Sequence, residues 1–227
     1  MERALRITQG FATWPAAPMG QLLAHSRLGH HERGSPFSTE TDEPETLAIV
    51  SGRMVMGRTP PGGTRAVFAF IGPGSVVGLA RSLDGKDQSV HDFSAHSKSV
   101  VAIHMPTRRL LEVLAREPAL WKDMALMLLR QHRDMLDTLL GQVIGPFPQR
   151  LAATIERLSR LYGSTAAGHA RQRLKVTQAD LAGVLQVTRQ TVNKELKSLA
   201  ETGAIALDYN AVTVLDIEAL RKITRSR

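Results

Sequence analysis

Hydrophobic and polar positions follow two different rhythms along the chain, and the change falls near residue 107. Before it, short runs rich in apolar and β-branched residues alternate with breaks that contain glycine or proline, and an amphipathic stretch at 21–34 precedes them. The runs are 46–50, 53–58, 66–70, 75–79, 89–95 and 99–105. This punctuation predicts an antiparallel barrel or double-sheet roll, because a parallel sheet would need helices between its strands.

From residue 107 onwards, apolar residues recur at the three- and four-residue steps of a helix. A short helical face is followed by Glu117-Pro118, which opens a longer segment reaching about residue 144. Its apolar stripe comprises Leu120, Met124, Met127, Leu128, Met135, Leu136, Leu139 and Val143. A helix of about 26 residues spans roughly 39 Å, more than a small domain. Packing on its own domain accounts for part of the stripe, and we expect the long helix to form a dimer interface.

Two prolines interrupt this helix at Gly145-Pro146-Phe147-Pro148, which predicts a hinge. An amphipathic helix at 151–162, a small-residue loop at 163–169 and a short extended or turn segment at 171–176 follow. Charge changes at the same place. Residues 146–227 carry 13 basic and 7 acidic side chains, whereas residues 1–145 carry 16 and 14. We therefore expect a domain boundary near residue 146 and a polyanionic partner for the carboxy-terminal part.

The segment 177–200 predicts two short helices joined by a tight turn, which is a helix-turn-helix pattern. Thr177 and Asp180 have the spacing of a capping arrangement at the start of the first helix. Thr188 can cap the second helix after the turn at Gln186-Val187. The expected inward positions of the two helices are Leu181, Val184, Leu185, Val192, Leu196 and Leu199.

The outward residues of the second helix have the chemistry that reads DNA grooves. Arginine can donate two hydrogen bonds to guanine, glutamine and asparagine can pair with adenine, and threonine or lysine can contact phosphate. The candidate DNA contacts are Thr177, Thr188, Arg189, Gln190, Thr191, Asn193, Lys194 and Lys197. Of these, we expect base contacts from Arg189, Gln190 and Lys194, and phosphate contacts from Thr177, Thr188 and Lys197. An ordinary solvated helix pair also shows polar residues outward, so the motif alone leaves that alternative open.

The residues after the second helix favour the DNA-binding interpretation. Gly203 ends that helix, and 204–215 predicts two short strands around Asp208-Tyr209-Asn210, the hairpin that forms a wing. Residues 216–222 then begin a final short helix. The order of these elements is a winged helix-turn-helix.

Composition narrows the possible functions. The 227 residues carry a formal net charge of +8 and no cysteine, which excludes disulfides, thiolate-bound iron–sulfur clusters and cysteine nucleophiles. No apolar run approaches the roughly 18 residues of a membrane span, and the first 25 residues lack a signal-peptide core, so we expect a cytoplasmic protein. Residues 1–20 receive no functional assignment.

In its order of elements the chain resembles the Crp/Fnr superfamily of bacterial transcription regulators, from about residue 25 to the end. The most specific motifs are Leu174-Lys-Val-Thr-Gln-Ala-Asp-Leu-Ala182, Val187-Thr-Arg-Gln-Thr-Val-Asn-Lys-Glu-Leu-Lys-Ser-Leu199 and Thr202-Gly-Ala-Ile205. In the family the recognition helix starts with Ser/Thr-Arg-Glu and later presents arginine. Here Gln190 replaces the acidic residue and Lys194 replaces the arginine, which implies an altered or relaxed half-site preference.

The resemblance implies an α+β protein with three parts. These are a β-roll effector-type domain at 1–116, a long dimerisation helix at 117–145 and a winged helix-turn-helix DNA-binding domain at 146–227. It implies a homodimer on palindromic double-stranded DNA, with RNA polymerase as a further partner. Control is expected to run through the 145–148 hinge, where an effector in the roll, or none, biases two placements of the DNA-binding domains.

The roll is expected to resemble a cyclic-nucleotide-binding domain with a degenerate pocket. In ligand-binding relatives a glutamate contacts the ribose and an arginine contacts the phosphate, and the matching positions here are Leu79 and Ser89. The full set of matching positions is Gly78, Leu79, Ser89, Val90, Met135 and Leu136. We therefore expect no binding of cyclic AMP in the usual manner, and the identity of any small-molecule effector stays open.

Other signals are weaker. Eight histidines raise a metal or haem hypothesis, but adjacent His30 and His31 point to different sides of most structures, and His91 with His96 lacks further ligands at suitable spacing. His91-Asp92 resembles the metal-binding dipeptide of phosphohydrolases, without a matching distant set. We expect no cofactor, no metal and no enzymatic activity. The alternatives are a nonspecific architectural DNA-binding protein and, third, a metal-dependent phosphohydrolase.

Overall fold

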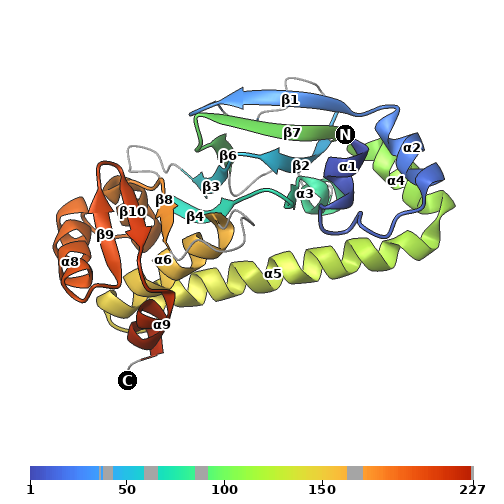
Figure 1. Ribbon diagram of the computed structural model, residues 1–227. Helices are drawn as coiled ribbons and strands as arrows, with labels where there is room; N and C mark the ends of the chain where they lie inside the picture. The colour runs from blue at the N-terminus through green and yellow to red at the C-terminus, as the bar shows by residue number, and fades with distance from the viewer. Residues whose placement is uncertain (36, 38–42, 59–65, 85–91, 163–170, 226–227) are drawn as a thin grey trace. The chain divides into compact units, whose positions relative to one another are not determined.

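The computed structural model describes residues 1–35, 37, 43–58, 66–84, 92–162 and 171–225 (Figure 1). The chain divides into two compact units, each described separately below. The first contains Met1–Met56 and Ile71–Asp134, and the second contains Gly57–Phe70 and Met135–Arg227. No helix in the described ranges has both the length and the apolar character needed to cross a membrane.

The main sheet of the first unit has four antiparallel strands in the order β1-β7-β2-β5. The strands are β1 (Arg27–Glu32), β2 (Glu45–Ser51), β5 (Val76–Val77) and β7 (Ser99–Pro106). A second sheet has the order β4-β3-β6, with β3 at Met54–Arg58, β4 at Ala66–Ile71 and β6 at Asp92–Ala95. The predicted α+β class with antiparallel sheets before the long helix is confirmed.

Three details of the sequence prediction need correction or limitation. The stretch 21–34 is not one amphipathic element, because α2 (Ala16–Leu23) ends inside it and β1 pairs along its whole length with β7. The run at 75–79 is strand only at Val76–Val77, and Leu79 begins the short helix α3 (Leu79–Asp84). Residues 89–91 of the predicted fifth run lie outside the described residues.

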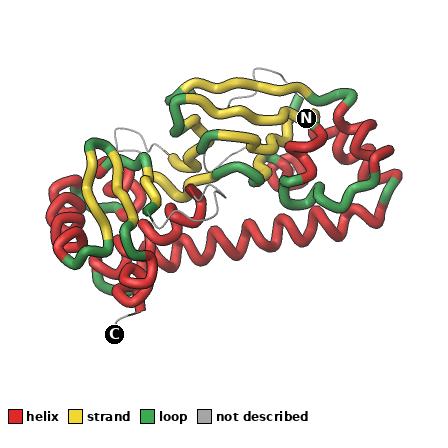
Figure 2. Tube along the Cα trace, viewed as in Figure 1, coloured by secondary structure: helices red, strands yellow, loops and turns green. Residues whose placement is uncertain are grey.

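Alternation along β2 and β7 separates two hydrophobic clusters, since successive side chains of a strand point to opposite faces. Ala48, Ile103 and Met105 belong to a larger cluster that the helices α1 (Glu2–Arg6), α2, α4 (Thr107–Arg116) and the start of α5 complete. Figure 2 shows the short helices gathered beside the ends of the strands. Ile49, Val100 and Ala102 face the other way and join Met54 and Ala95.

The amino-terminal residues belong to this core. Phe11 and Trp14 are almost completely buried, their ring centroids lie 4.9 Å apart, and both pack in the cluster that contains Met124 and Met127 of α5. Residues 1–20 thus have a structural role that periodicity alone did not reveal, because their two short helices hold too few residues to show a repeat.

The long helix is observed as α5 (Trp121–Val143), preceded by the 3₁₀ turn η1 (Pro118–Leu120). Its predicted stripe divides into two parts. Leu120, Met124 and Met127 are buried in the core of the first unit. The later apolar residues are largely exposed, with Leu136 at 43% and Val143 at 76%.

The second unit contains the winged helix-turn-helix. Its elements are α6 (Phe147–Tyr162), β8 (Gln172–Leu174), α7 (Gln178–Leu185), α8 (Arg189–Glu201), β9 (Ile205–Asp208), β10 (Ala211–Val214) and α9 (Ile217–Arg225). The strands form an antiparallel sheet in the order β8-β10-β9. All six predicted inward positions of the helix pair are buried.

The connection between α5 and α6 is shorter than the sequence predicted. The helix breaks at 144–146, but α6 already begins at Phe147, so Pro148 lies in its first turn. Proline is tolerated there because the first amide groups of a helix have no intrahelical acceptor. The two helices are further joined by Arg150, whose Nη1 donates to the carbonyl oxygen of Gln142 (2.6 Å), and by Arg157, which donates to Thr138. Burial lowers the pKa of Arg157 to about 10, with a further contribution from Arg160.

Replacing Gly78 by alanine should destabilise the roll. Gly78 has a φ of +94°, and a Cβ there would lie 2.4 Å from the carbonyl oxygen of Glu45. We expect the free energy of unfolding, measured in urea, to fall by about 1–3 kcal/mol. Gly20→Ala is the matched control, since no described atom lies within 4 Å of a Cβ at this position of α2. It should stabilise by up to about 1 kcal/mol, and equal losses in both variants would contradict the proposed clash.

Candidate nucleic-acid interface

The first helix of the pair, α7, has a fixed starting point. Thr177 Oγ1 accepts a hydrogen bond from the Asp180 amide (3.1 Å), and Asp180 Oδ2 accepts one from the Thr177 amide (2.8 Å). The predicted capping box is therefore present, with aspartate in place of the usual glutamate. Gln186, in the left-handed conformation with φ of 54°, ends α7 and forms the tight turn.

The second helix, α8, is fixed by its cap and by its apolar face. Thr188 Oγ1 accepts from the Thr191 amide (3.1 Å), which satisfies one of the free donors of the first turn. Val192, Leu196 and Leu199 are at most 3% exposed. Because residues three and four apart share one face, their burial directs the intervening polar residues outward.

Most of the predicted contact residues are exposed in the second unit. Thr188, Arg189, Gln190, Thr191, Lys194 and Lys197 are exposed, and Thr177 and Asn193 are partly buried. Among the described residues, none of Arg189, Lys194 and Lys197 forms an ion pair. The cationic groups of α8 are thus available to an anionic partner.

Sequence reasoning missed Gln178, the first residue of α7. Its Nε2 donates to Asn193 Oδ1 (3.1 Å), and its Oε1 accepts from Arg189 Nε (3.3 Å). Gln178 therefore links the start of one helix to two residues that lie one turn apart on the other. The available signal was its position beside the Thr177 cap, where a side chain can reach the neighbouring helix.

The wing and the last helix add further structure around α8. β9 and β10 meet at Tyr209 and Asn210, and Tyr209 is 90% exposed. Arg173 of β8 pairs with Asp208 (3.4 Å). Arg221 of α9 donates to Glu156 of α6 and to Glu218, and these hydrogen bonds raise the pKa of Arg221.

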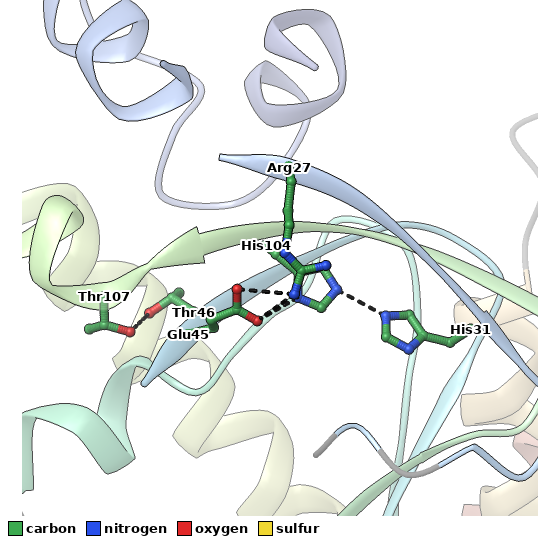
Figure 3. Close-up of polar contacts among 6 residues, drawn as sticks. All are labelled: Arg27, His31, Glu45, Thr46, His104 and Thr107. Atoms are coloured by element: carbon green, nitrogen blue, oxygen red, sulfur yellow. Dashed lines mark hydrogen bonds and ion pairs between the residues drawn. The ribbon is translucent and has the colours of Figure 1, made fainter. Parts of the chain in front are cut away.

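A polar network lies on the inward face of the roll's main sheet, within the first unit (Figure 3). Glu45 of β2 is within 2.7 Å of His104 Nδ1 of β7, and Arg27 of β1 donates to both carboxylate oxygens (3.1 and 3.2 Å). His104 Nε2 lies 2.9 Å from His31 Nε2, and the His31 ring stacks on Phe37 with a centroid distance of 3.9 Å. These residues come from three strands, so spacing along the chain did not predict them.

The positions matched to a cyclic-nucleotide pocket are only partly described. Gly78 begins the turn into α3, and Leu79 is buried in the larger hydrophobic cluster. On α5, Met135 is half-buried and Leu136 is exposed. Ser89 and Val90 lie outside the described residues, as does His91 of the predicted phosphohydrolase dipeptide.

The described residues contain no group of three or more histidine, aspartate, glutamate or cysteine side chains that could hold a metal ion. His30 is exposed and His31 is partly buried, as expected for adjacent residues on a strand.

Comparison with known proteins agrees with this architecture. Residues 149–223 match the model of the Crp-like helix-turn-helix domain. The chain is 28% identical over 194 residues to the CRP-like cAMP-activated global transcriptional regulator of Mycobacterium tuberculosis, covering 85% of this chain and 86% of that protein. It is 27% identical over 229 residues to the nitrogen fixation regulation protein FixK of Bradyrhizobium diazoefficiens, covering 96% and 91%.

Solved structures show the same fold. FixK2 from Bradyrhizobium japonicum aligns with a TM-score of 0.73 at 14% identity, covering 89% of this chain and 98% of that one. A Crp/Fnr-family transcriptional regulator from Thermus thermophilus aligns with a TM-score of 0.71 at 21% identity, covering 88% and 100%.

The roll, the long helix and the winged helix-turn-helix together define a DNA-binding transcription regulator. Residues 149–223 match the Crp-like helix-turn-helix domain, and the relatives and solved structures support the resemblance to Crp/Fnr superfamily transcription regulators that the recognition-helix motifs predicted.

Proposed function

We propose that this regulator acts as a homodimer that binds a palindromic DNA site by inserting α8 of each subunit into a major groove. The observation that carries the proposal is the outer surface of α8, where polar and cationic side chains are exposed while the opposite face is buried. In helix-turn-helix dimers the two half-sites lie about one helical turn, roughly 34–36 Å, apart.

The side chains of α8 divide by the contacts they can make. Arg189 and Gln190 lie in its first turn and Lys194 one turn later, and we assign base contacts to these three residues. We assign phosphate contacts to three other residues. Thr177 and Thr188 cap the starts of α7 and α8, and Lys197 lies farther along α8. Such contacts fix the position of the protein along the DNA duplex. Gln190 has an amide in place of the carboxylate that would accept a hydrogen bond from cytosine. Because a glutamine amide can pair with adenine, we expect a preference for adenine at that position.

The exposed part of α5 supports the dimer. Leu129, Leu136, Leu140 and Val143 recur at seven-, four- and three-residue steps and are 60%, 43%, 52% and 76% exposed. Exposure of an apolar stripe of this length to water is unfavourable, because burial of each leucine side chain would contribute about 1.5–3 kcal/mol of free energy. The same helix of a second copy offers the matching stripe.

The roll is proposed to have lost the usual cyclic AMP site. Leu79 is 1% exposed and packs in the hydrophobic cluster, where relatives that bind the nucleotide carry a glutamate. The M. tuberculosis relative is named as cAMP-activated, but an alkyl group cannot bond a ribose hydroxyl. Either a different small-molecule effector or none, and action on RNA polymerase, complete the proposal.

Selection of tight binders from a random duplex pool, with purified full-length protein and no added ligand, tests the proposed function. Recovery of a palindrome would establish a dimeric, sequence-specific regulator that needs no cyclic nucleotide. Recovery of no motif, both alone and after addition of cyclic AMP, would contradict ligand-free sequence-specific binding and leave two interpretations, a requirement for another effector or nonspecific electrostatic binding, which binding to random duplexes at several salt concentrations separates.

Two substitutions should separate base contacts from phosphate contacts. Arg189→Ala should cost about 1–3 kcal/mol on the selected site and remove the preference at one base pair. Lys197→Ala should weaken selected and scrambled duplexes alike and reduce the salt slope by about 1. Fluorescence anisotropy at several salt concentrations measures both. Equal losses on the two duplexes for Arg189→Ala would overturn its assignment.

A charge within the exposed stripe of α5 should dissociate the dimer. We expect Leu129→Asp and Leu140→Asp to give monomers in analytical ultracentrifugation, because a carboxylate cannot be buried without a partner. Arg130→Asp is the control, because Arg130 is exposed and lies outside the apolar stripe. A dimer that survives both leucine variants, or a monomeric wild type, would contradict the interface.

A further inference from the structure

Gln178 is the structural link between two predicted DNA contacts. Its amide oxygen accepts from Arg189 Nε at 3.3 Å, and its amide nitrogen donates to Asn193 Oδ1 at 3.1 Å. A carboxamide supplies a donor and an acceptor on one planar group, so glutamine can make both bonds at once. Because Arg189 Nε can only donate, it fixes the amide oxygen of Gln178 on its side and leaves the amide nitrogen toward Asn193.

We propose that Gln178 is a positioning residue for DNA recognition, holding the Arg189 guanidinium in place through its Nε. This inference rests on the proposed function. Because the bond uses Nε, both terminal amino groups of Arg189 stay free to donate to guanine O6 and N7. An arginine ordered before binding loses less side-chain entropy when it meets the base.

The same geometry gives Asn193 a different role from the one expected from sequence. Its Oδ1 accepts from Gln178 Nε2 and its side chain is partly buried, so the Asn193 amide is held toward α7 and a base contact would have to compete with this link. Asn193 therefore serves as the far end of the Gln178 support rather than as a base contact.

Replacing Gln178 by methionine tests the proposal, because methionine has similar length and no amide. We expect discrimination at the base pair assigned to Arg189 to fall about threefold to tenfold, the range of one hydrogen bond, with scrambled DNA bound as before. In the Arg189→Ala background, Gln178→Met should have no additional effect. Gln186→Met is the control, since Gln186 Nε2 donates only to Gly183 O among the described contacts (2.6 Å).

Three results would overturn the positioning role. These are equal loss on selected and scrambled duplexes, a persistent effect without Arg189, or unchanged discrimination. A second readout does not depend on DNA: the Arg189 Nε proton in nuclear magnetic resonance (NMR) spectra of the free protein should exchange faster with water in Gln178→Met. Failure of the wild type to select any site would contradict ligand-free sequence-specific binding, whereas unchanged Nε exchange would contradict this inference alone.

A second inference comes from the histidine pair inside the roll, independently of DNA binding. The Nε2 atoms of His31 and His104 are 2.9 Å apart, so one ring must donate and the other must accept. His104 Nδ1 lies 2.7 Å from Glu45 Oε2 and donates to it. Protonation of both rings would remove the hydrogen bond and leave two cations facing each other.

The surroundings of His31 oppose protonation of its ring. The charged or titratable groups that act on it are Arg27 and, on the opposite face of the strand, His30 of β1, together with His104 of β7 and Glu45 of β2. Burial lowers the pKa of His31 from its usual 6.5, and His104 and Arg27 lower it further, while Glu45 acts in the opposite direction. The one carboxylate is already bonded to Arg27 and His104.

We propose that the hydrogen bond between His31 and His104 holds β1 against β7 and is lost in acid. We call this pair the acid-sensitive lock on β1. This strand lies at the edge of its sheet and pairs only with β7 among the described strands. The pKa of His31 is lower in the folded protein than in the unfolded chain. The contribution of the neutral His31 ring to folding stability is therefore complete above about pH 6.5, and it is lost as the pH falls through the folded pKa. Acid should therefore release β1 before the interior strands.

Hydrogen exchange followed by NMR tests the lock. Between about pH 7.5 and pH 5, protection factors of the β1 amides should fall relative to those of β2, across the range in which histidine titrates. His31→Gln can still donate to His104 without titrating and should remove this pH dependence. His30→Gln, on the exposed face of the same strand, is the matched control and should preserve it.

The lock is wrong if His31→Gln keeps the pH dependence of the wild type or if His30→Gln removes it. Direct titration of the His31 ring by NMR in the unmodified protein tests the proposal without any substitution. A pKa at or above 6.5 would overturn the proposal.

Discussion

The burial of Val192, Leu196 and Leu199 is the constraint on which recognition by this protein depends. Once these side chains are packed inside the winged helix-turn-helix, helical geometry determines that Arg189, Gln190 and Lys194 face outward. The capping box at Thr177 and the cap at Thr188 fix where each helix begins, so the angular position of each polar residue is set as well. Specific DNA chemistry here is a consequence of apolar packing on the opposite side of a single helix.

The helix-turn-helix could be predicted from sequence because its determinants are local. Caps, turn residues and an apolar repeat all lie within residues 177–200, and the structure confirms the two helices and the wing. The amino-terminal part of the chain was harder to predict from sequence. β1 contains polar residues at both inward and outward positions, so no alternation revealed a strand that is defined by its pairing with β7. Phe11 and Trp14 escaped notice for a related reason, since their core role depends on α5 more than 100 residues later.

The unpredicted functional groups are those that tertiary structure brings together. Gln178 meets Arg189 and Asn193 across the turn, which requires the angle between α7 and α8. His31 and His104 are separated by 73 positions and meet only because β1 and β7 are neighbours in the sheet. Eight histidines in a sequence give no indication of which two share a proton. Residue types identify possible chemistry, whereas the register of strands and helices selects the partners.

Gly29 limits which side chains β1 can carry beside His104 of β7. It lies between Arg27 and His31 on β1, and a Cβ at this position would be 2.4 Å from His104 Nε2. The imidazole of His104 therefore fills the space that any other side chain at position 29 would need. Loss of the glycine would displace the ring, and loss of the ring would remove the need for the glycine. A larger residue at position 29 therefore requires displacement or loss of the His104 ring, whereas position 104 can change while Gly29 stays.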